Sequence, residues 1–138
     1  MSRLADQLAT LPLFSACSKR DLQRLAKATD EMTVPAGTEL TTQGGVGREA
    51  FIVVTGTASV TRDGVLLAEV GPGAHIGELA LLDGGPRSAT VTATSDMSLL
   101  VMSKPAFNAV LDEIPTLAHK LLVSLARRLR ESEQSLSH

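Results

Sequence analysis

The chain has 138 residues, of which 43% are hydrophobic and 20% are charged, and its formal net charge is −2. This length and composition are those of a single globular domain and exclude a disordered chain. Nucleic-acid-binding domains usually carry a basic face or aromatic stacking platforms. A net negative chain without Trp or Tyr therefore disfavours nucleic acid as a partner of this chain alone.

Three further absences narrow the class of protein. No apolar run approaches the ~20 residues of a membrane span, and the N-terminal stretch contains Asp6 and no long apolar core, unlike a signal peptide. The single cysteine, Cys17, excludes an internal disulfide and a thiolate metal cluster. We therefore expect a cytoplasmic protein that does not associate with membranes.

The N-terminal zone, residues 1–28, is expected to be helical. Leu22, Leu25 and Ala26 form a stripe with helical spacing, and Ser18 is placed to cap that helix. Pro12, within the segment 11–14, is expected to divide the zone in two.

Residues 30–103 carry short runs of Val, Thr and Ile separated by glycines at regular intervals. Such spacing is typical of a closed or sandwiched β structure. Asp63-Gly64 predicts a tight hairpin, because both residues tolerate the positive φ angles that such a turn requires.

After Lys104 the hydrophobic period becomes helical. One helix is expected around Phe107, and a second, longer helix from Pro115 to about residue 137. We find no linker, so the chain is predicted to form one domain over residues 1–138.

The segment 77–91, Gly-Glu-Leu-Ala-Leu-Leu-Asp-Gly-Gly-Pro-Arg-Ser-Ala-Thr-Val, is the most informative part of the sequence. It combines a short helix, expected to be anchored by its leucines, a Gly-Gly-Pro bend and one arginine. A helix N-terminus and the planar fork of Arg87 both favour a phosphate group. Glu78 offers an acceptor for sugar hydroxyls. The segment therefore predicts a pocket for a small phosphorylated sugar.

This segment resembles the phosphate-binding cassette of the cyclic-nucleotide-binding domains, which occur in catabolite activator-type regulators, kinase regulatory subunits and gated channels. The resemblance extends over roughly residues 12–137, and includes the stretches 35–40, 51–60 and 71–78. It implies an α+β fold: an antiparallel β-roll with N-terminal helices and a C-terminal helical pair that ends in a long helix.

The resemblance also implies a regulatory domain without catalytic residues or metal, whose reversible ligand is cAMP, with cGMP as the alternative. Arg87 would pair with the cyclic phosphate and also bridge to the carboxylate of Glu78. Glu78 would accept the ribose 2′-hydroxyl. The implied ligand-binding residues are Gly77, Glu78, Leu79, Ala80, Arg87, Ser88 and Ala89.

The last helix is expected to have two roles. By resemblance, its movement carries the signal, and Arg128, Ser132 and Glu133 are candidate contacts to the base. Its apolar pattern also predicts a homodimer, because one stripe steps alternately by four and three residues like a coiled-coil seam. That seam comprises Ala118, Leu122, Leu125, Leu129, Ser132 and Leu136, whereas Leu117 and Leu121 would pack on the β-roll.

Three alternatives remain open. The chain could be a nucleotide-free interaction or structural module that kept the fold, which the intact set of Glu78, Arg87 and Ser88 disfavours. The chain could be the effector-domain fragment of a catabolite activator-type transcription regulator. It could also be a cupin-like metal enzyme, since His75 lies three residues before Glu78. The absence of a His-x-His pair disfavours the enzyme. His75 is more simply explained as a strand residue near the mouth of the pocket.

Overall fold

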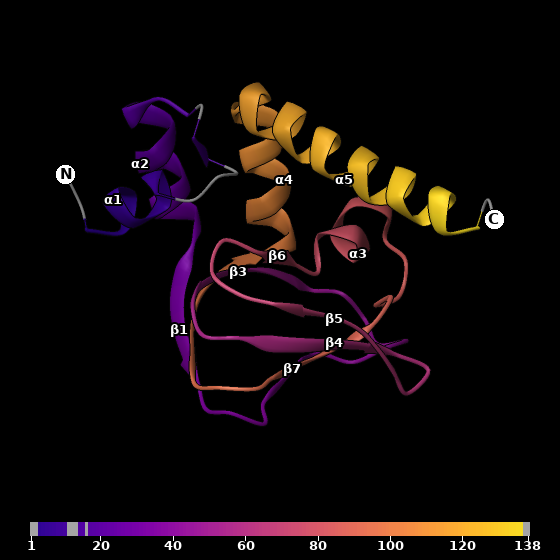
Figure 1. The fold of residues 1–138 in the computed structure, drawn as a ribbon. Helices are drawn as coiled ribbons and strands as arrows, with labels where there is room; N and C mark the ends of the chain where they lie inside the picture. The colour runs from indigo at the N-terminus through magenta and orange to yellow at the C-terminus, as the bar shows by residue number, and fades with distance from the viewer. Residues whose placement is uncertain (1–2, 11–13, 16, 137–138) are drawn as a thin grey trace.

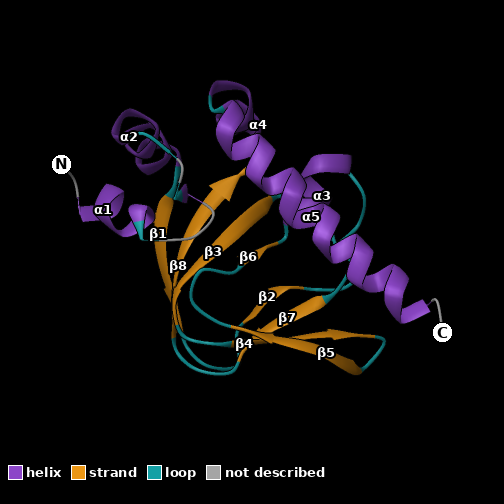
Figure 2. Ribbon diagram, turned by 45° about the horizontal axis from the view of Figure 1, so that its top comes forward, coloured by secondary structure: helices purple, strands orange, loops and turns teal. Residues whose placement is uncertain are grey.

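The computed structural model describes residues 3–10, 14–15 and 17–136. It contains two antiparallel sheets that face each other, with the helices gathered on one side (Figures 1 and 2). The helix-side sheet has the strand order β1-β8-β3-β6 and the outer sheet has the order β2-β7-β4-β5. The strands are β1 (Asp30–Val34), β2 (Glu39–Thr41), β3 (Glu49–Thr55), β4 (Ala58–Arg62), β5 (Val65–Val70), β6 (His75–Ile76), β7 (Thr90–Ala93) and β8 (Met97–Ser103).

Alternation along β3 explains the two hydrophobic cores. Phe51 and Val53 point between the sheets, whereas Ala50 and Ile52 belong to the cluster beneath the helices. All four are buried. Successive strand side chains point to opposite faces, so a strand buried on both faces is apolar without interruption.

The helices are α1 (Arg3–Ala9), α2 (Lys19–Ala28), α3 (Glu78–Asp83), α4 (Lys104–Glu113) and α5 (Pro115–Leu136). Ser18 accepts a hydrogen bond from the amide of Asp21, and the side chain of Asp21 accepts one from the amide of Ser18, which completes a capping box. The proline-dependent break at residues 11–13 lies outside the described residues. Among the described helices, none combines the length and apolarity that crossing a bilayer requires.

The hairpin and the C-terminal helices form as their sequences predict. Asp63 and Gly64 have φ angles of 54° and 78° and join β4 to β5. Leu117 and Leu121 are both buried in the cluster beneath the helices, as predicted for the face of α5 that packs on the roll. The α+β β-roll expected from the sequence is confirmed.

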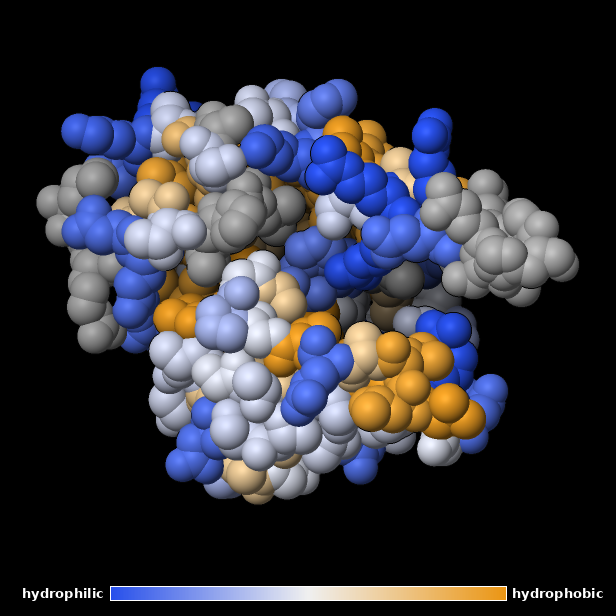
Figure 3. Space-filling view, in the orientation of Figure 1, coloured by the Kyte–Doolittle hydropathy of each residue, from blue (hydrophilic) through white to orange (hydrophobic). Residues whose placement is uncertain are grey.

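Some apolar side chains remain outside both cores. Leu82 is 44% exposed, so the expectation that it anchors the short helix α3 is wrong, whereas Leu81 is buried. Val65, Leu66 and Leu67 on the edge strand β5 are also exposed. They form an apolar patch below the C-terminal part of α5 (Figure 3).

Candidate ligand-binding site

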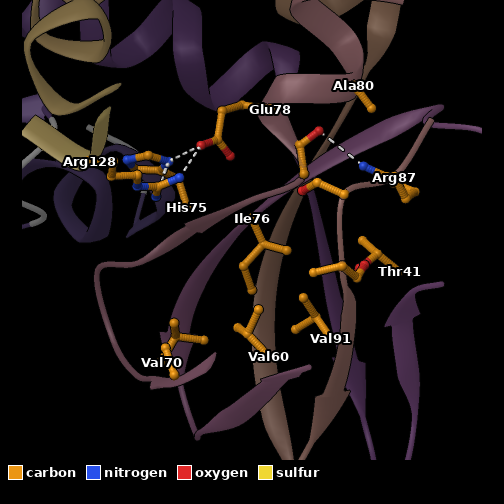
Figure 4. A pocket seen from close by; sticks show the side chains of 14 residues that line it. Thr41, Val60, Val70, His75, Ile76, Glu78, Ala80, Arg87, Val91 and Arg128 are labelled. Atoms are coloured by element: carbon orange, nitrogen blue, oxygen red, sulfur yellow. Dashed lines mark hydrogen bonds and ion pairs between the residues drawn. The ribbon is translucent and has the colours of Figure 1, made fainter. Parts of the chain in front are cut away.

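A cavity of about 260 Å³ opens between the outer sheet, α3 and α5. Its apolar wall is formed by Val60, Val70, Ile76 and Val91, and its polar groups gather above that wall (Figure 4). Small-molecule pockets begin at roughly 300 Å³ and combine an apolar lining with a few polar groups. At about 260 Å³ the cavity lies just below that size, and it has the lining of a site for a small, partly polar ligand.

Arg87 is the buried cation of this cavity, with 7% of its surface exposed. Its Nη1 donates to the carbonyl of Gly77 at 3.0 Å, and its Nη2 donates to the carbonyl of Glu49 at 2.8 Å. A guanidinium has five N–H donors, so these two bonds do not exhaust it. Burial lowers the pKa of Arg87, which the carboxylates of Glu49 and Glu78 partly offset.

The local backbone holds Arg87 in this position. Its amide donates to the carbonyl of Gly45 and its carbonyl accepts from the amide of Gly44. Gly77 has a φ of 84°, and a Cβ at that position would collide with Nη1 of Arg87. A glycine is therefore required at residue 77 both for the turn into α3 and for the close approach of the guanidinium.

Glu78 is the buried anion, with 3% of its side chain exposed. Nη1 of Arg128 donates to its Oε1 at 2.9 Å, and Nδ1 of His75 lies 2.9 Å from the same oxygen. Burial would raise the pKa of Glu78, but the hydrogen bond and charge of His75, the residue's own amide and Arg128 together hold it below the ordinary value of 4.5. Glu78 is therefore ionised at neutral pH.

The structure brings most of the predicted site residues to this cavity. Gly77, Glu78, Ala80, Arg87, Ser88, Ala89 and Arg128 all line it. Leu79 lies in α3, but its side chain is outside the described residues, as are those of Ser132 and Glu133 in α5. His75 lies in β6 and lines the cavity, as expected of a strand residue near its mouth.

Two details differ from the sequence-based expectations. Arg87 does not bridge to Glu78, because its described hydrogen bonds go to backbone carbonyls. In the described part of the chain, the side chains of Arg128 and His75 each lie 2.9 Å from the Glu78 carboxylate. The wall residues Val60, Val70 and Val91, together with Thr41, were not predicted. Thr41 donates to the carbonyl of Ala89 at 2.9 Å, a pairing between distant residues that leaves no local pattern in the sequence.

Comparison with known proteins is consistent with this geometry. A family model described as the cyclic nucleotide-binding domain matches residues 31–113. The chain belongs to this family. It is 32% identical over 130 residues to the cyclic AMP receptor protein of Thermus thermophilus, a match that covers 91% of this chain and 60% of that protein. The chain therefore spans little more than half the length of this relative.

Solved structures show the same relationship. The catabolite activator protein of Thermus thermophilus superposes with a TM-score of 0.84 and 33% identity, over 91% of this chain and 62% of that chain. The regulatory domain of Toxoplasma gondii PKA, solved with cAMP, superposes with a TM-score of 0.69 and 35% identity, over 78% of this chain and 42% of that chain. Both likenesses cover most of this chain but less than two thirds of the other chain.

The cupin-like alternative requires a cluster of metal ligands. Among the described residues, no group of three or more His, Cys, Asp or Glu side chains is arranged to hold a metal ion. His75 instead contacts Glu78, as described above, and Ser124 of α5. The family match is to a regulatory binding domain, and both described contacts of the His75 ring nitrogens with Glu78 and Ser124 are contacts within the protein.

Proposed function

We propose that the chain reversibly binds cAMP as a regulatory signal, in the cavity beneath α5. The observation that carries this proposal is the buried cation Arg87, whose described hydrogen bonds go to carbonyls and leave its charge for an anion. A buried charge is costly unless it is paired. An incoming cyclic phosphate would supply a direct anionic partner, which the described hydrogen bonds of Arg87 lack.

The proposed roles divide the cavity into three parts. Arg87, the hydroxyl of Ser88 and the amide of Ala89 bind the phosphate, and the backbone of residues 77–80 lines the sugar. Glu78 accepts the ribose 2′-hydroxyl. The apolar wall receives the flat face of the purine, next to Arg128. Serine at position 88 and the cAMP-bound structural relative favour cAMP over cGMP.

The ligand is proposed to act through α5. Arg128 lies on α5 and contacts Glu78 of the cassette, although 50 positions separate the two residues. A ligand that occupies the cavity therefore changes the surroundings of a residue on α5. Binding shifts a protein towards the arrangement that the ligand prefers, so the output would be a change in the position of α5.

We also propose that α5 forms a homodimer. Leu122 and Leu129 are 65% and 61% exposed on the predicted seam of this helix.

The cyclic AMP receptor protein of Thermus thermophilus is longer than this chain, which covers 60% of it. The output domain therefore has two candidates: the chain belongs to a catabolite activator-type transcription regulator, or it acts as a stand-alone sensor.

Calorimetric titration of cAMP and cGMP into the purified chain tests the proposed ligand. We expect saturable binding of cAMP, tighter than that of cGMP. Loss of one partner from a buried charged contact costs roughly 2–5 kcal/mol, so Arg87→Ala should weaken cAMP binding by at least ~30-fold.

The matched control is Arg48→Ala, because Arg48 is an exposed arginine that does not line the cavity. It should bind cAMP like the parent protein. Equal cAMP affinity in Arg87→Ala and the parent would contradict the proposed phosphate contact. No binding of either nucleotide to the folded parent would contradict the proposed function itself.

A further inference from the structure

His75 lies between the cassette and the last helix. Its side chain is 13% exposed. Nδ1 lies 2.9 Å from Oε1 of Glu78, and Nε2 lies 3.2 Å from Oγ of Ser124 on α5 (Figure 4 shows the contact with Glu78). The imidazole thus joins two segments that are 49 residues apart in the chain.

The surroundings of the ring determine where its proton lies. Nδ1 at hydrogen-bond distance from an ionised carboxylate must carry hydrogen, because two acceptors would repel each other. Nη2 of Arg128 lies 3.3 Å from the same nitrogen and, as a donor, cannot then be hydrogen-bonded to it. Nε2 faces the hydroxyl of Ser124, which can donate or accept. The hydrogen bond between Nε2 and Ser124 of α5 can therefore form whether the ring is neutral or protonated.

All the described side-chain contacts to Glu78 use one of its two oxygens. His75 and Arg128 both reach Oε1. An ionised carboxylate has about four lone-pair sites on two oxygens, so Oε2 is not required for either contact. A carboxylate fixed through Oε1 has a defined orientation and presents Oε2 as an acceptor.

We propose that His75 is a positioning residue of the nucleotide site. It orients the Glu78 carboxylate towards the ribose hydroxyl, and it connects that carboxylate to α5 through its contact with Ser124. The inference rests on the proposed binding of a cyclic nucleotide. Arg128 makes a second tie, but its side chain is 49% exposed. The more buried ring is the better-fixed support of the two.

The charges around His75 add a pH dependence. Glu78 of α3 and Arg128 of α5 contact the ring directly, and Arg87 lies across the cavity. A groove that His75 also lines adds four further groups of α5: His119, Lys120, Arg127 and Glu131. A phosphate anion that enters this largely cationic setting favours the protonated ring. By linkage, cAMP affinity should then rise as the pH falls.

The test compares His75→Phe, His75→Asn and the control His119→Phe. Calorimetry measures the affinity for cAMP and for 2′-deoxy-cAMP between pH 5.5 and 8. We expect His75→Phe to bind cAMP about tenfold more weakly, to discriminate less against the deoxy analogue and to lose the pH dependence. An Asn amide can replace Nδ1–H, so His75→Asn should recover the discrimination without the pH dependence. His119→Phe should match the parent in affinity and in discrimination.

Nitrogen NMR of the ring provides a readout that needs no ligand. We expect Nδ1 of His75 to carry a proton in the ligand-free protein, and an Nδ1 without a proton would overturn the proposal. Unchanged affinity, discrimination and pH profile in His75→Phe would overturn it as well. If the parent binds no cyclic nucleotide, the proposed function fails, and the ring spectrum still decides whether His75 orients Glu78.

Discussion

At the scale of single residues, the site is organised by two opposite buried charges with different partners. Arg87 is supported by carbonyls of Gly77 and Glu49, whereas Glu78 is supported by the imidazole of His75 and the guanidinium of Arg128. A carboxylate beside a phosphate site would repel the ligand. The separate partners of the two charges reduce this repulsion. Here the direct cationic partner of Glu78 is Arg128 of α5, and the described hydrogen bonds of Arg87 go to carbonyls instead.

The role of Glu78 can be tested by removing either partner of its proposed hydrogen bond. A hydrogen bond to a charged group contributes about 1.5–3 kcal/mol, so the parent should bind cAMP at least ~10-fold more tightly than 2′-deoxy-cAMP. Glu78→Gln should discriminate much less, because its amide is neutral. Competition binding measures both ratios. A parent protein that binds the two nucleotides equally well would remove this role from Glu78.

The depressed pKa of Glu78 also predicts how stability varies with pH. A carboxyl group whose pKa is lower in the folded state stabilises the fold above its unfolded pKa, and this contribution is lost as the pH falls through the folded value. Thermal unfolding of the ligand-free parent should therefore move to lower temperature below pH 4.5, the ordinary pKa of the group.

The Glu78→Gln variant supplies the comparison for that experiment. It cannot titrate at this position, so its melting temperature should fall less steeply between pH 5 and pH 3 than that of the parent. Parallel curves for the two proteins would show that the contacts of Glu78 with His75 and Arg128 do not stabilise the fold.

At the scale of elements, the sequence predicts what local patterns determine. The cap at Ser18, the turn at Asp63-Gly64 and the buried stripe of Leu117 and Leu121 all depend on residues close together in the chain. The clustering of residues 77–89 was predicted because the cassette is contiguous. The contact of Arg128 with Glu78 depends instead on how α5 crosses the roll, and no periodicity in the sequence encodes that crossing.

The contact between α5 and the cassette gives a prediction for the helix as a unit. Removal of Arg128 breaks a hydrogen bond between α5 and the buried Glu78. The negative charge of that carboxylate is then less well neutralised and repels an incoming phosphate more strongly. Arg128→Ala should therefore weaken cAMP binding several-fold, and reduce the change in hydrogen exchange that cAMP causes in α5.

Arg130→Ala is the matched control, because Arg130 is an exposed arginine one half-turn further along the same helix. It should leave both the affinity and the exchange pattern of α5 as in the parent. A nucleotide-dependent exchange pattern in Arg128→Ala that equals the parent's would show that α5 receives the signal by another route.

At the scale of the whole molecule, α5 has one face committed to the fold and another that is not. Leu117 and Leu121 are buried against the core, whereas Leu122 and Leu129 are mostly exposed. Leu125 is partly buried and packs on the chain's own core cluster, although the predicted seam includes it. The side chains of Ser132 and Leu136 lie outside the described residues. The exposed positions that carry the dimer proposal are therefore Leu122 and Leu129.

These two positions allow the dimer to be tested without disturbing the core. Leucines on a coiled-coil seam are buried on association, and each is worth about 1.5–3 kcal/mol when fully buried. Leu122→Glu combined with Leu129→Glu should therefore convert a dimer into a monomer in light scattering. Thr116→Glu with Val123→Glu adds the same charge at exposed positions away from the seam and should remain dimeric. If the parent itself is a monomer at tens of micromolar, with and without cAMP, these leucines are not a dimer seam. In that case the ties from α5 to Glu78 act within one chain, and α5 serves as the lid of its own pocket.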